Sequence, residues 1–265
     1  MLAKRVVSAA VLIPIVGVAV YLGGVGFFVL VTLASLMAGY EYLRIMRDAG
    51  LAPSYPFGLV LIALLVIDAQ WPRFDLLRRG LALFPLALLG VAVFHGNASG
   101  SLVDWALTIA GGIYVGFSMS HFVRLRSIDR GMDWLALALL GTWICDSGAY
   151  FVGSALGKHG FFPKISPNKT LEGAFAGLVC GALAVVLIGR FLLGLGIGWG
   201  FLLGVLLALA ATFGDLAESL IKRQVGVKDS AAIISGHGGM LDRVDSLLFV
   251  VPLVYYFATT FELLA

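Results

Sequence analysis

Long apolar runs alternate with short polar or glycine-rich breaks along almost the whole chain. Each run is close to the ~20 residues that cross a bilayer as a helix. The runs lack the strict apolar and polar alternation of a membrane β-barrel, and lipid offers no partner for an open backbone. The pattern predicts an all-α, polytopic transmembrane helical bundle of about nine helices, near residues 6–22, 25–43, 56–70, 77–94, 102–122, 133–156, 170–194, 198–223 and 240–263.

The composition supports this class of protein. Of the 265 residues, 60% are hydrophobic and 12% are charged, against roughly 25% charged in soluble domains. This excludes a soluble enzyme, and we expect no separate soluble domain. The net charge of +3 is too small for a nucleic-acid footprint, so we expect membrane lipids and no nucleic acid as partners. With the N-terminus in the cytosol, most Lys and Arg residues fall on the cytosolic side, which favours that orientation.

Acidic residues in or beside the predicted helices gather in the second half of the chain. The first half is almost purely apolar, so we expect the chemistry after residue 140. An acidic side chain inside a bilayer is costly and is usually functional. The residues concerned are Asp146, Glu172, Asp215, Glu218, Asp242 and Asp245.

The eighth predicted helix carries five polar residues on one face, because they follow the spacing i, i+3, i+4, i+7 and i+8. They are Asp215, Glu218, Ser219, Lys222 and Arg223. If Lys222 and Arg223 mark the membrane surface, Asp215 lies about 10 Å deeper. Two readings stay open: this face borders a cavity or an ion, or Lys222 makes an internal structural pair with Asp215 or Glu218.

Asp242 and Asp245 repeat the i, i+3 spacing at the start of the ninth predicted helix, with Arg243 and Ser246 beside them. Asp146 lies deep inside the sixth and is expected to face the same cavity. Several Asp oxygens without His or Cys favour Mg²⁺, which keeps waters and is usually completed by substrate phosphates. Capping of the helix N-terminus is the alternative for Asp242, but it leaves Asp245 unexplained.

Two loops carry further polar residues. In the first, Lys228 and Asp229 precede His237, Gly238 and Gly239, whose glycines let backbone N–H groups converge on an anion. His237 could contact a phosphate or a base, or be merely solvated.

The second loop joins the sixth and seventh predicted helices and contains Lys164, Ser166, Asn168, Lys169 and Thr170. Its lysines, close to hydroxyls, could hold nucleotide phosphates. Alternatively, the lysines are positive-inside anchors, and Ser166 or Thr170 caps the next helix.

The motifs of the second half match a known pattern. The matching segments are Ser219-Leu220-Ile221-Lys222-Arg223, Lys228-Asp229 and His237-Gly238-Gly239-Met240-Leu241-Asp242-Arg243-Val244-Asp245. This arrangement resembles the signature of the CDP-diacylglycerol synthase (phosphatidate cytidylyltransferase) family, with no departure within it. The segments Asp146-Ser147-Gly148-Ala149-Tyr150 and Ser166-Pro167-Asn168-Lys169-Thr170 look like further family motifs, whereas residues 1–130 match only in hydropathy.

The resemblance implies an integral membrane nucleotidyltransferase that makes CDP-diacylglycerol and pyrophosphate from CTP and phosphatidate. It implies Mg²⁺, with the number of further cations left open, and a homodimer. Residues 1–130 would form a lipid-facing packing and dimer scaffold, and residues 131–265 would carry the catalytic site. The chain starts directly with its first helix, which suits a prokaryotic plasma (inner) membrane, with the active site on the cytoplasmic side.

The roles expected from the resemblance and the residue chemistry form three groups. Metal ligands on the triphosphate are Asp215, Asp242 and Asp245. Cations that counter its charge are Lys222, Arg223 and Lys228, of which Lys222 and Lys228 are expected to be catalytic. Other substrate-binding residues are Asp146, Lys164, Ser166, Asn168, Lys169, Glu218, Ser219, Asp229, His237, Gly238, Gly239 and Arg243.

Two alternatives remain. One is a related CTP-dependent enzyme with another lipid acceptor, such as a CDP-archaeol synthase or a polyprenol kinase. The other is an ion-coupled transporter, whose carboxylates would bind protons or cations along a pathway. A transporter would be supported by broken helices and inverted repeats, and the sequence shows neither.

Overall fold

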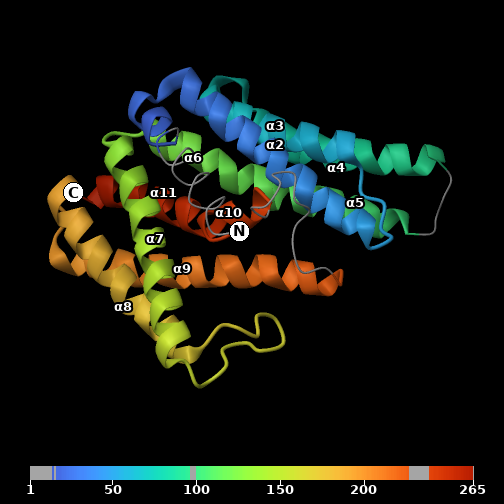
Figure 1. Cartoon of the computed structure of the whole chain (residues 1–265). Helices are drawn as coiled ribbons and strands as arrows, with labels where there is room; N and C mark the ends of the chain where they lie inside the picture. Colours follow the sequence, from blue (N-terminus) through green and yellow to red (C-terminus); the bar gives the residue numbers. More distant parts are fainter. Residues whose placement is uncertain (1–13, 15, 96–99, 227–238, 265) are drawn as a thin grey trace. The chain divides into compact units, whose positions relative to one another are not determined.

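The computed structural model describes residues 14, 16–95, 100–226 and 239–264, with side chains described except at 95 and 262–264. Most of these residues are helical, and within these ranges there is no β-strand, only an isolated bridge between Gly160 and Thr170. Figure 1 shows the helices in chain order. The predicted all-α class is confirmed.

The helices follow the predicted apolar runs closely. The α-helices are α2 (Gly24–Asp48), α3 (Tyr55–Gln70), α4 (Leu76–His95), α5 (Ser101–Gly111), α6 (Ser118–Ser127), α7 (Gly131–Leu156), α8 (Leu171–Ile188), α9 (Ile197–Gln224), α10 (Leu241–Val244) and α11 (Leu247–Leu264). A 3₁₀ turn, η1 (Pro72–Phe74), and two π-helical segments, η2 (Gly112–Phe117) and η3 (Gly189–Leu193), complete them.

The lengths and composition of the helices fit a multi-pass membrane protein. Within the described residues, seven helical stretches are long and apolar enough to cross a membrane, with α5 to α6, α8 to η3 and α10 to α11 each counting as one. The apolar helix α3 is shorter, with 16 residues. The first predicted run, 6–22, lies largely outside the described residues, although 16–22 are helical.

The hydropathy pattern did not predict where these helices are irregular. The π-helical segments η2 and η3 interrupt two of the predicted runs. The ninth run, predicted as one helix, is broken at Asp245 and Ser246, which form a turn between α10 and α11. Asp242 and Asp245 therefore do not share one continuous helix, and the prediction that they do was wrong.

The chain divides into two compact units. Unit 1 comprises Met1–Arg124 and Gln224–Arg243, and unit 2 comprises Leu125–Arg223 and Val244–Ala265. Of the second segment of unit 1, the structure describes residues 224–226 and 239–243. Each unit contains sequence from both halves of the chain.

In unit 1, α2 and α3 pack against each other, and α4, α5 and η2 pack against α3 (Figure 1). Asp68, near the end of α3, is only 4% exposed. Its carboxylate accepts hydrogen bonds from Arg124 Nη2 at 2.6 Å and from the Leu77 N–H at 3.0 Å. Because a buried charge needs such partners, Asp68 ties α3 to α4 and α6.

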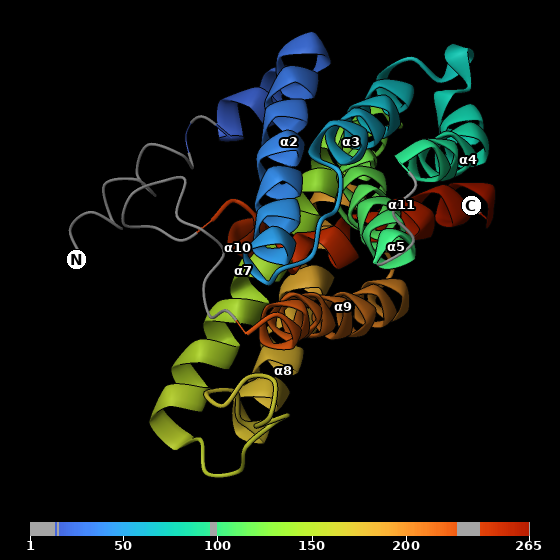
Figure 2. The ribbon, with the colours of Figure 1, turned by 90° about the vertical axis from the view of Figure 1, so that its right-hand side faces the viewer.

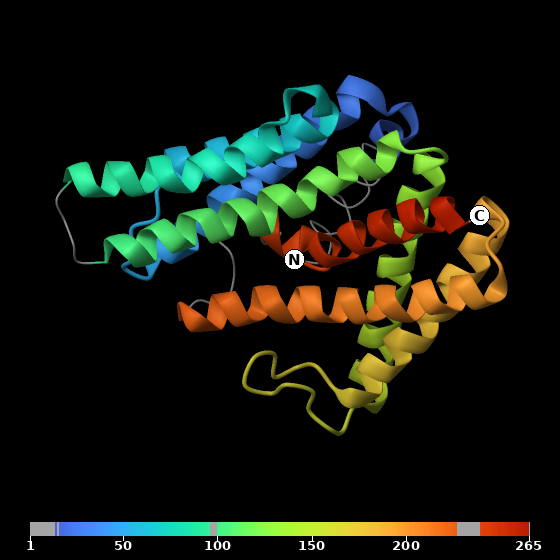
Figure 3. The same cartoon turned by 180° about the vertical axis from the view of Figure 1, so that it is seen from behind.

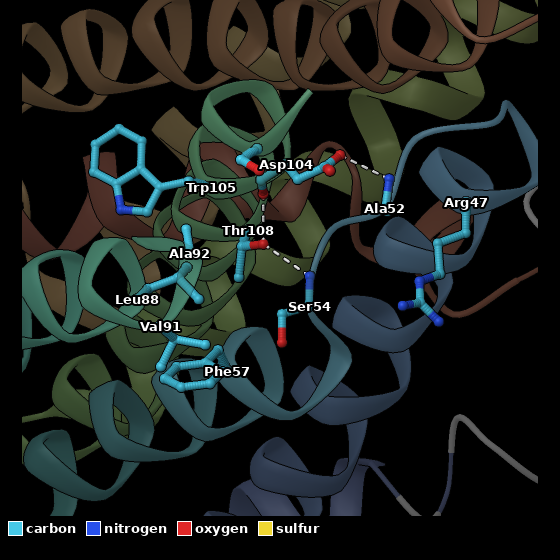
Figure 4. Close-up of a pocket in the computed structure, with 11 residues that line it drawn as sticks. Arg47, Ala52, Ser54, Phe57, Leu88, Val91, Ala92, Asp104, Trp105 and Thr108 are labelled. Carbon is cyan, nitrogen blue, oxygen red and sulfur yellow. Dashed lines mark hydrogen bonds between the residues drawn. The ribbon is translucent and has the colours of Figure 1, made fainter. Parts of the chain in front are cut away.

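Unit 1 also contains a pocket of about 470 Å³ between the ends of α2, α3, α4 and α5 (Figure 4). Its lining is partly apolar, as at Leu88, and partly polar. Asp104 accepts a hydrogen bond from the Ala52 N–H at 2.7 Å, and the Thr108 hydroxyl accepts one from the Ser54 N–H at 2.9 Å. These hydrogen bonds thus hold the loop between α2 and α3. None of the predicted site residues lines the pocket.

In unit 2, α7 and α8 pack closely along their length. A β-carbon at Gly173 would lie 2.7 Å from the Ala149 carbonyl oxygen, so only glycine permits this approach. Small residues let membrane helices come together in this way. The first turn of α7 meets α11 where the Trp134 and Phe257 rings pack edge to face, and α9 crosses α8 (Figure 3). The four helices form one packed body.

Candidate active site

An ion pair between Lys169 and Asp215 joins two of the predicted site residues in unit 2. Asp215 lies in α9 and Lys169 in the loop before α8, and Nζ and Oδ2 are 2.8 Å apart. The side chains are 26% and 38% exposed, so both remain accessible. The Ser219 hydroxyl donates a long hydrogen bond to the other Asp215 oxygen at 3.4 Å. A predicted phosphate-binding lysine thus lies against a predicted metal ligand.

Two further carboxylates act on this pair. Asp146, in α7, interacts electrostatically with Asp215 and Lys169. Asp245, in the turn between α10 and α11, interacts with Asp215, Asp146 and Lys222. Acidic groups from three parts of unit 2 therefore share one region, which we call the carboxylate cluster (Asp146, Asp215 and Asp245). Since neighbouring like charges repel, such a cluster favours bound cations.

The turn that carries Asp245 lies close to α9 at Gly214. A β-carbon at Gly214 would lie 2.7 Å from the Asp245 carbonyl oxygen and 2.8 Å from Ser246 Cα. The Asp245 carboxylate also accepts the Ser246 N–H at 2.6 Å. Glycine is therefore required next to Asp215 for the turn to pack here.

Replacing Gly214 by alanine is expected to displace this turn. Overpacking of this kind costs about 1–3 kcal/mol, so the thermal unfolding temperature in detergent should fall and enzymatic turnover should fall with it. Gly198→Ala is the matched control, because Gly198 also lies in α9 and nothing lies within 4 Å of a β-carbon there. Indistinguishable results for the two variants would contradict the proposed packing.

The other charged residues on this face of α9, Glu218, Lys222 and Arg223, also form ion pairs or hydrogen bonds. Glu218 Oε2 and Lys222 Nζ are 2.6 Å apart, and their side chains are 2% and 13% exposed. Of the two structural pairs of Lys222 that the helix spacing allowed, the structure thus contains the one with Glu218. Arg223 Nε donates to the Ile165 carbonyl oxygen at 3.3 Å, which ties the end of α9 to the loop before α8.

That loop, residues 157–170, joins α7 to α8 (Figure 2), and Glu172 binds its first residues. The Glu172 carboxylate accepts the N–H groups of Lys158 and His159 at 3.2 and 3.3 Å and contacts His159 Nδ1 at 2.6 Å. Thr170 caps α8 by accepting the Gly173 N–H at 3.2 Å, which confirms the capping alternative for this residue. In the same loop, Ser166 is half-buried, and Lys164 and Asn168 are exposed.

Glu172→Ala is expected to loosen this loop, because three hydrogen-bonding contacts are lost together. Amide hydrogen exchange should rise severalfold at Lys158 and His159, and turnover should fall because Lys169 is carried by the same loop. Glu172→Gln keeps an acceptor oxygen and should behave between wild type and alanine. Unchanged exchange in the alanine variant would show that Glu172 does not hold the loop.

Asp242 belongs to unit 1, where its carboxylate accepts the Gly239 N–H at 2.9 Å. This bond is of the capping kind considered for Asp242. The exposed residue Arg243 follows it in α10. Four predicted site residues lie outside the described residues, namely Lys228, Asp229, His237 and Gly238.

One residue near Asp242 was not predicted from the sequence. Glu41, in α2, is 0% exposed and accepts the Leu241 N–H at 2.8 Å. The rule that an acidic residue inside an apolar span is usually functional applies to Glu41 as well. It was missed because the first half of the chain was read as apolar packing.

The donors of the carboxylate cluster are suited to a hard divalent cation. Aspartate oxygens without a His or Cys companion match the preference of Mg²⁺. In the described part of the chain, no three His, Cys, Asp or Glu side chains are grouped closely enough to enclose a metal by themselves. Mg²⁺ commonly uses one or two carboxylates with water and substrate phosphates, so the donor set fits this ion.

Helical stretches that are long and apolar enough to cross a membrane, with acidic and basic side chains grouped among them, are typical of an integral membrane protein. A sequence model of the "Cytidylyltransferase family" matches residues 3–261. The chain therefore belongs to the cytidylyltransferase family and is a nucleotidyltransferase enzyme.

Curated relatives agree with this assignment. The chain is 34% identical over 249 residues to the phosphatidate cytidylyltransferase of Bacillus subtilis, covering 92% of each chain. It is 38% identical over 197 residues to the enzyme of the same name from Staphylococcus epidermidis, covering 74% of each. A third, from Staphylococcus aureus, is 39% identical over 199 residues, which cover 74% of this chain and 75% of the relative.

Proposed function

We propose that the protein transfers the cytidylyl group of CTP to phosphatidate and releases pyrophosphate, so that CDP-diacylglycerol forms. The observation that carries this proposal is the Lys169–Asp215 pair within the carboxylate cluster of a membrane-helix unit. A reaction between two polyanions requires both cations and metal-binding carboxylates. The relatives named phosphatidate cytidylyltransferase support the choice of acceptor.

The reaction itself demands alignment and charge neutralisation more than proton transfer. A phosphatidate oxygen forms a bond to the α-phosphorus of CTP, and the bond from that phosphorus to the α,β-bridging oxygen breaks. The electron pair leaves with pyrophosphate. A phosphate monoester is already anionic near neutral pH, so the nucleophile needs no strong general base. Catalysis then rests on positioning and electrostatics.

The chain's own residues supply these functions. Asp215 and Asp245 would hold Mg²⁺, as the resemblance of the motif implies for Asp242 as well, and Asp146 would shape the site. When bound, Mg²⁺ neutralises the triphosphate and polarises the oxygens around the reacting phosphorus. Lys169, whose ammonium group pairs with Asp215, would supply the positive charge that binds a substrate phosphate.

The other charged residues support the same reaction. Lys222, Arg223 and Lys228 counter the charge of the triphosphate, with Lys222 held in place by Glu218. A site about 10 Å below the end of α9 can receive one substrate from the bilayer and the other from water. We propose that this site faces the cytoplasmic side of the plasma membrane, because the distribution of Lys and Arg favours a cytosolic N-terminus. We also propose that the working assembly is a homodimer.

Position-specific labels in CTP test the proposed reaction. The purified protein in detergent, given phosphatidate and Mg²⁺, should carry an α-phosphorus label from CTP into lipid and a γ-phosphorus label into pyrophosphate. A γ label in lipid would indicate a lipid kinase instead. A panel that includes archaeol phosphate and polyprenol tests the acceptor, because preference for either over phosphatidate would contradict the proposal.

A further inference from the structure

Glu41 is a buried carboxylate in the largely apolar N-terminal helices. It lies in α2, one of the candidate membrane spans, and its side chain is 0% exposed. A carboxylate in such a place is costly unless it is paired or hydrogen-bonded. Its presence therefore calls for a specific partner.

That partner is the start of α10, in the same unit. Glu41 Oε2 accepts the Leu241 backbone N–H at 2.8 Å, and Figure 2 shows α10 beside one end of α2. The first N–H groups of any helix have no partner within the helix. In α10, with four residues, Glu41 supplies an acceptor from a residue 200 positions away in the chain.

The segment so held leads directly into a proposed metal ligand. Leu241 is fully buried and immediately precedes Asp242. Asp242 in turn accepts the Gly239 N–H at 2.9 Å. Glu41 and Asp242 therefore each fix one N–H of the segment Gly239–Asp242, and the Glu41 bond sets where its backbone lies on α2.

We propose that Glu41 is a positioning residue for the transfer reaction: by binding the Leu241 N–H it fixes the Gly239–Asp242 segment, and through it the Asp242 carboxylate, in the place needed for metal and nucleotide binding. This inference rests on the proposed function, because it takes the reaction as given. What matters in Glu41 is an acceptor oxygen at the right reach, and its negative charge is secondary.

Three substitutions of Glu41 distinguish the effect of side-chain length from the effect of its negative charge. Glu41→Gln keeps an acceptor oxygen at the same distance and should retain most of the activity. Glu41→Asp keeps the charge but is one methylene shorter, and Glu41→Ala removes the acceptor. Both should lower kcat by about 10- to 100-fold, the range typical for residues that orient metal ligands, and both should raise the Mg²⁺ concentration needed for half-maximal rate.

Asp68→Asn is the matched control, since it removes another buried carboxylate of unit 1 that also accepts a backbone N–H. It should alter thermal unfolding without changing the Mg²⁺ requirement. If Asp68→Asn shifts that requirement as much as Glu41→Ala does, or if Glu41→Asp exceeds Glu41→Gln in activity, the positioning role is wrong.

A readout without turnover keeps this inference separate from the proposed function. Amide hydrogen exchange at Leu241 should rise severalfold in Glu41→Ala and Glu41→Asp but stay near wild type in Glu41→Gln. Protected exchange in all variants would overturn the positioning role even in an active enzyme. The expected exchange pattern in a protein that does not convert phosphatidate would instead overturn the proposed function alone.

Discussion

Asp215→Asn is expected to abolish cytidylyl transfer while the protein still inserts and purifies normally. Asparagine has the size of aspartate but lacks the charge that pairs with Lys169 and that we propose binds Mg²⁺. Loss of one preorganised electrostatic group costs about 10²–10³ in kcat, and we expect the upper end because Asp215 interacts with both other carboxylates of the cluster. The measurement is the initial rate of CDP-diacylglycerol formation.

Stability should respond differently from activity in this variant. Removing the Asp215 charge relieves repulsion with Asp146 and Asp245, which offsets the loss of a partly exposed ion pair worth at most about 1 kcal/mol. Thermal unfolding should therefore change little. Asp133→Asn is the control, because it breaks a comparable pair with Arg130 at the other end of α7 and should leave the rate unchanged. A wild-type rate for Asp215→Asn would remove this residue from the metal role.

Lys169→Ala should be the second most damaging substitution, with about a 10²-fold loss of kcat/KM. The ammonium group is the cation in direct contact with Asp215 at 2.8 Å, so it is placed to neutralise a phosphate that binds next to the metal. Lys169→Arg keeps the charge with a different shape and should recover part of the loss. Steady-state kinetics with CTP and phosphatidate varied in turn will show which substrate it binds.

Lys158→Ala provides the comparison for this lysine. Lys158 lies in the same loop and is exposed, and its contact with Glu172 is made by its backbone N–H. Its replacement should leave kcat/KM unchanged. If both lysine variants lose activity equally, general loop charge and not the Asp215 contact explains the effect.

The sequence predicted the helices well because hydropathy is a local property of each run. Where it failed, the cause was an interaction outside the run. α2 continues to Asp48 instead of ending near 43, and Ile45 and Met46 in its last turns are buried against other parts of unit 1. The break before α11 accompanies the approach of Asp245 and Ser246 to Gly214, which no local pattern reveals.

In the candidate site, too, contacts within one helix could be predicted from the sequence, whereas contacts between distant segments could not. Helix spacing alone placed Glu218 and Lys222 on one face, and the structure pairs them. The contact of Lys169 with Asp215 joins a loop to a helix far along the chain, and the role of Glu41 depends on Leu241. Such contacts depend on tertiary packing. The roles predicted for Lys228 and His237, outside the described residues, stay predictions.

In the proposed reaction, the carboxylate cluster binds the Mg²⁺ that is required for cytidylyl transfer to phosphatidate. The most direct test is a Mg²⁺ titration of CDP-diacylglycerol formation by the purified wild-type protein, with Asp245→Asn beside it. We predict saturable, Mg²⁺-dependent product from the wild type, none after chelation, and none from the variant at any Mg²⁺ concentration. Equal rates for the two proteins, or full activity after chelation, would contradict the account.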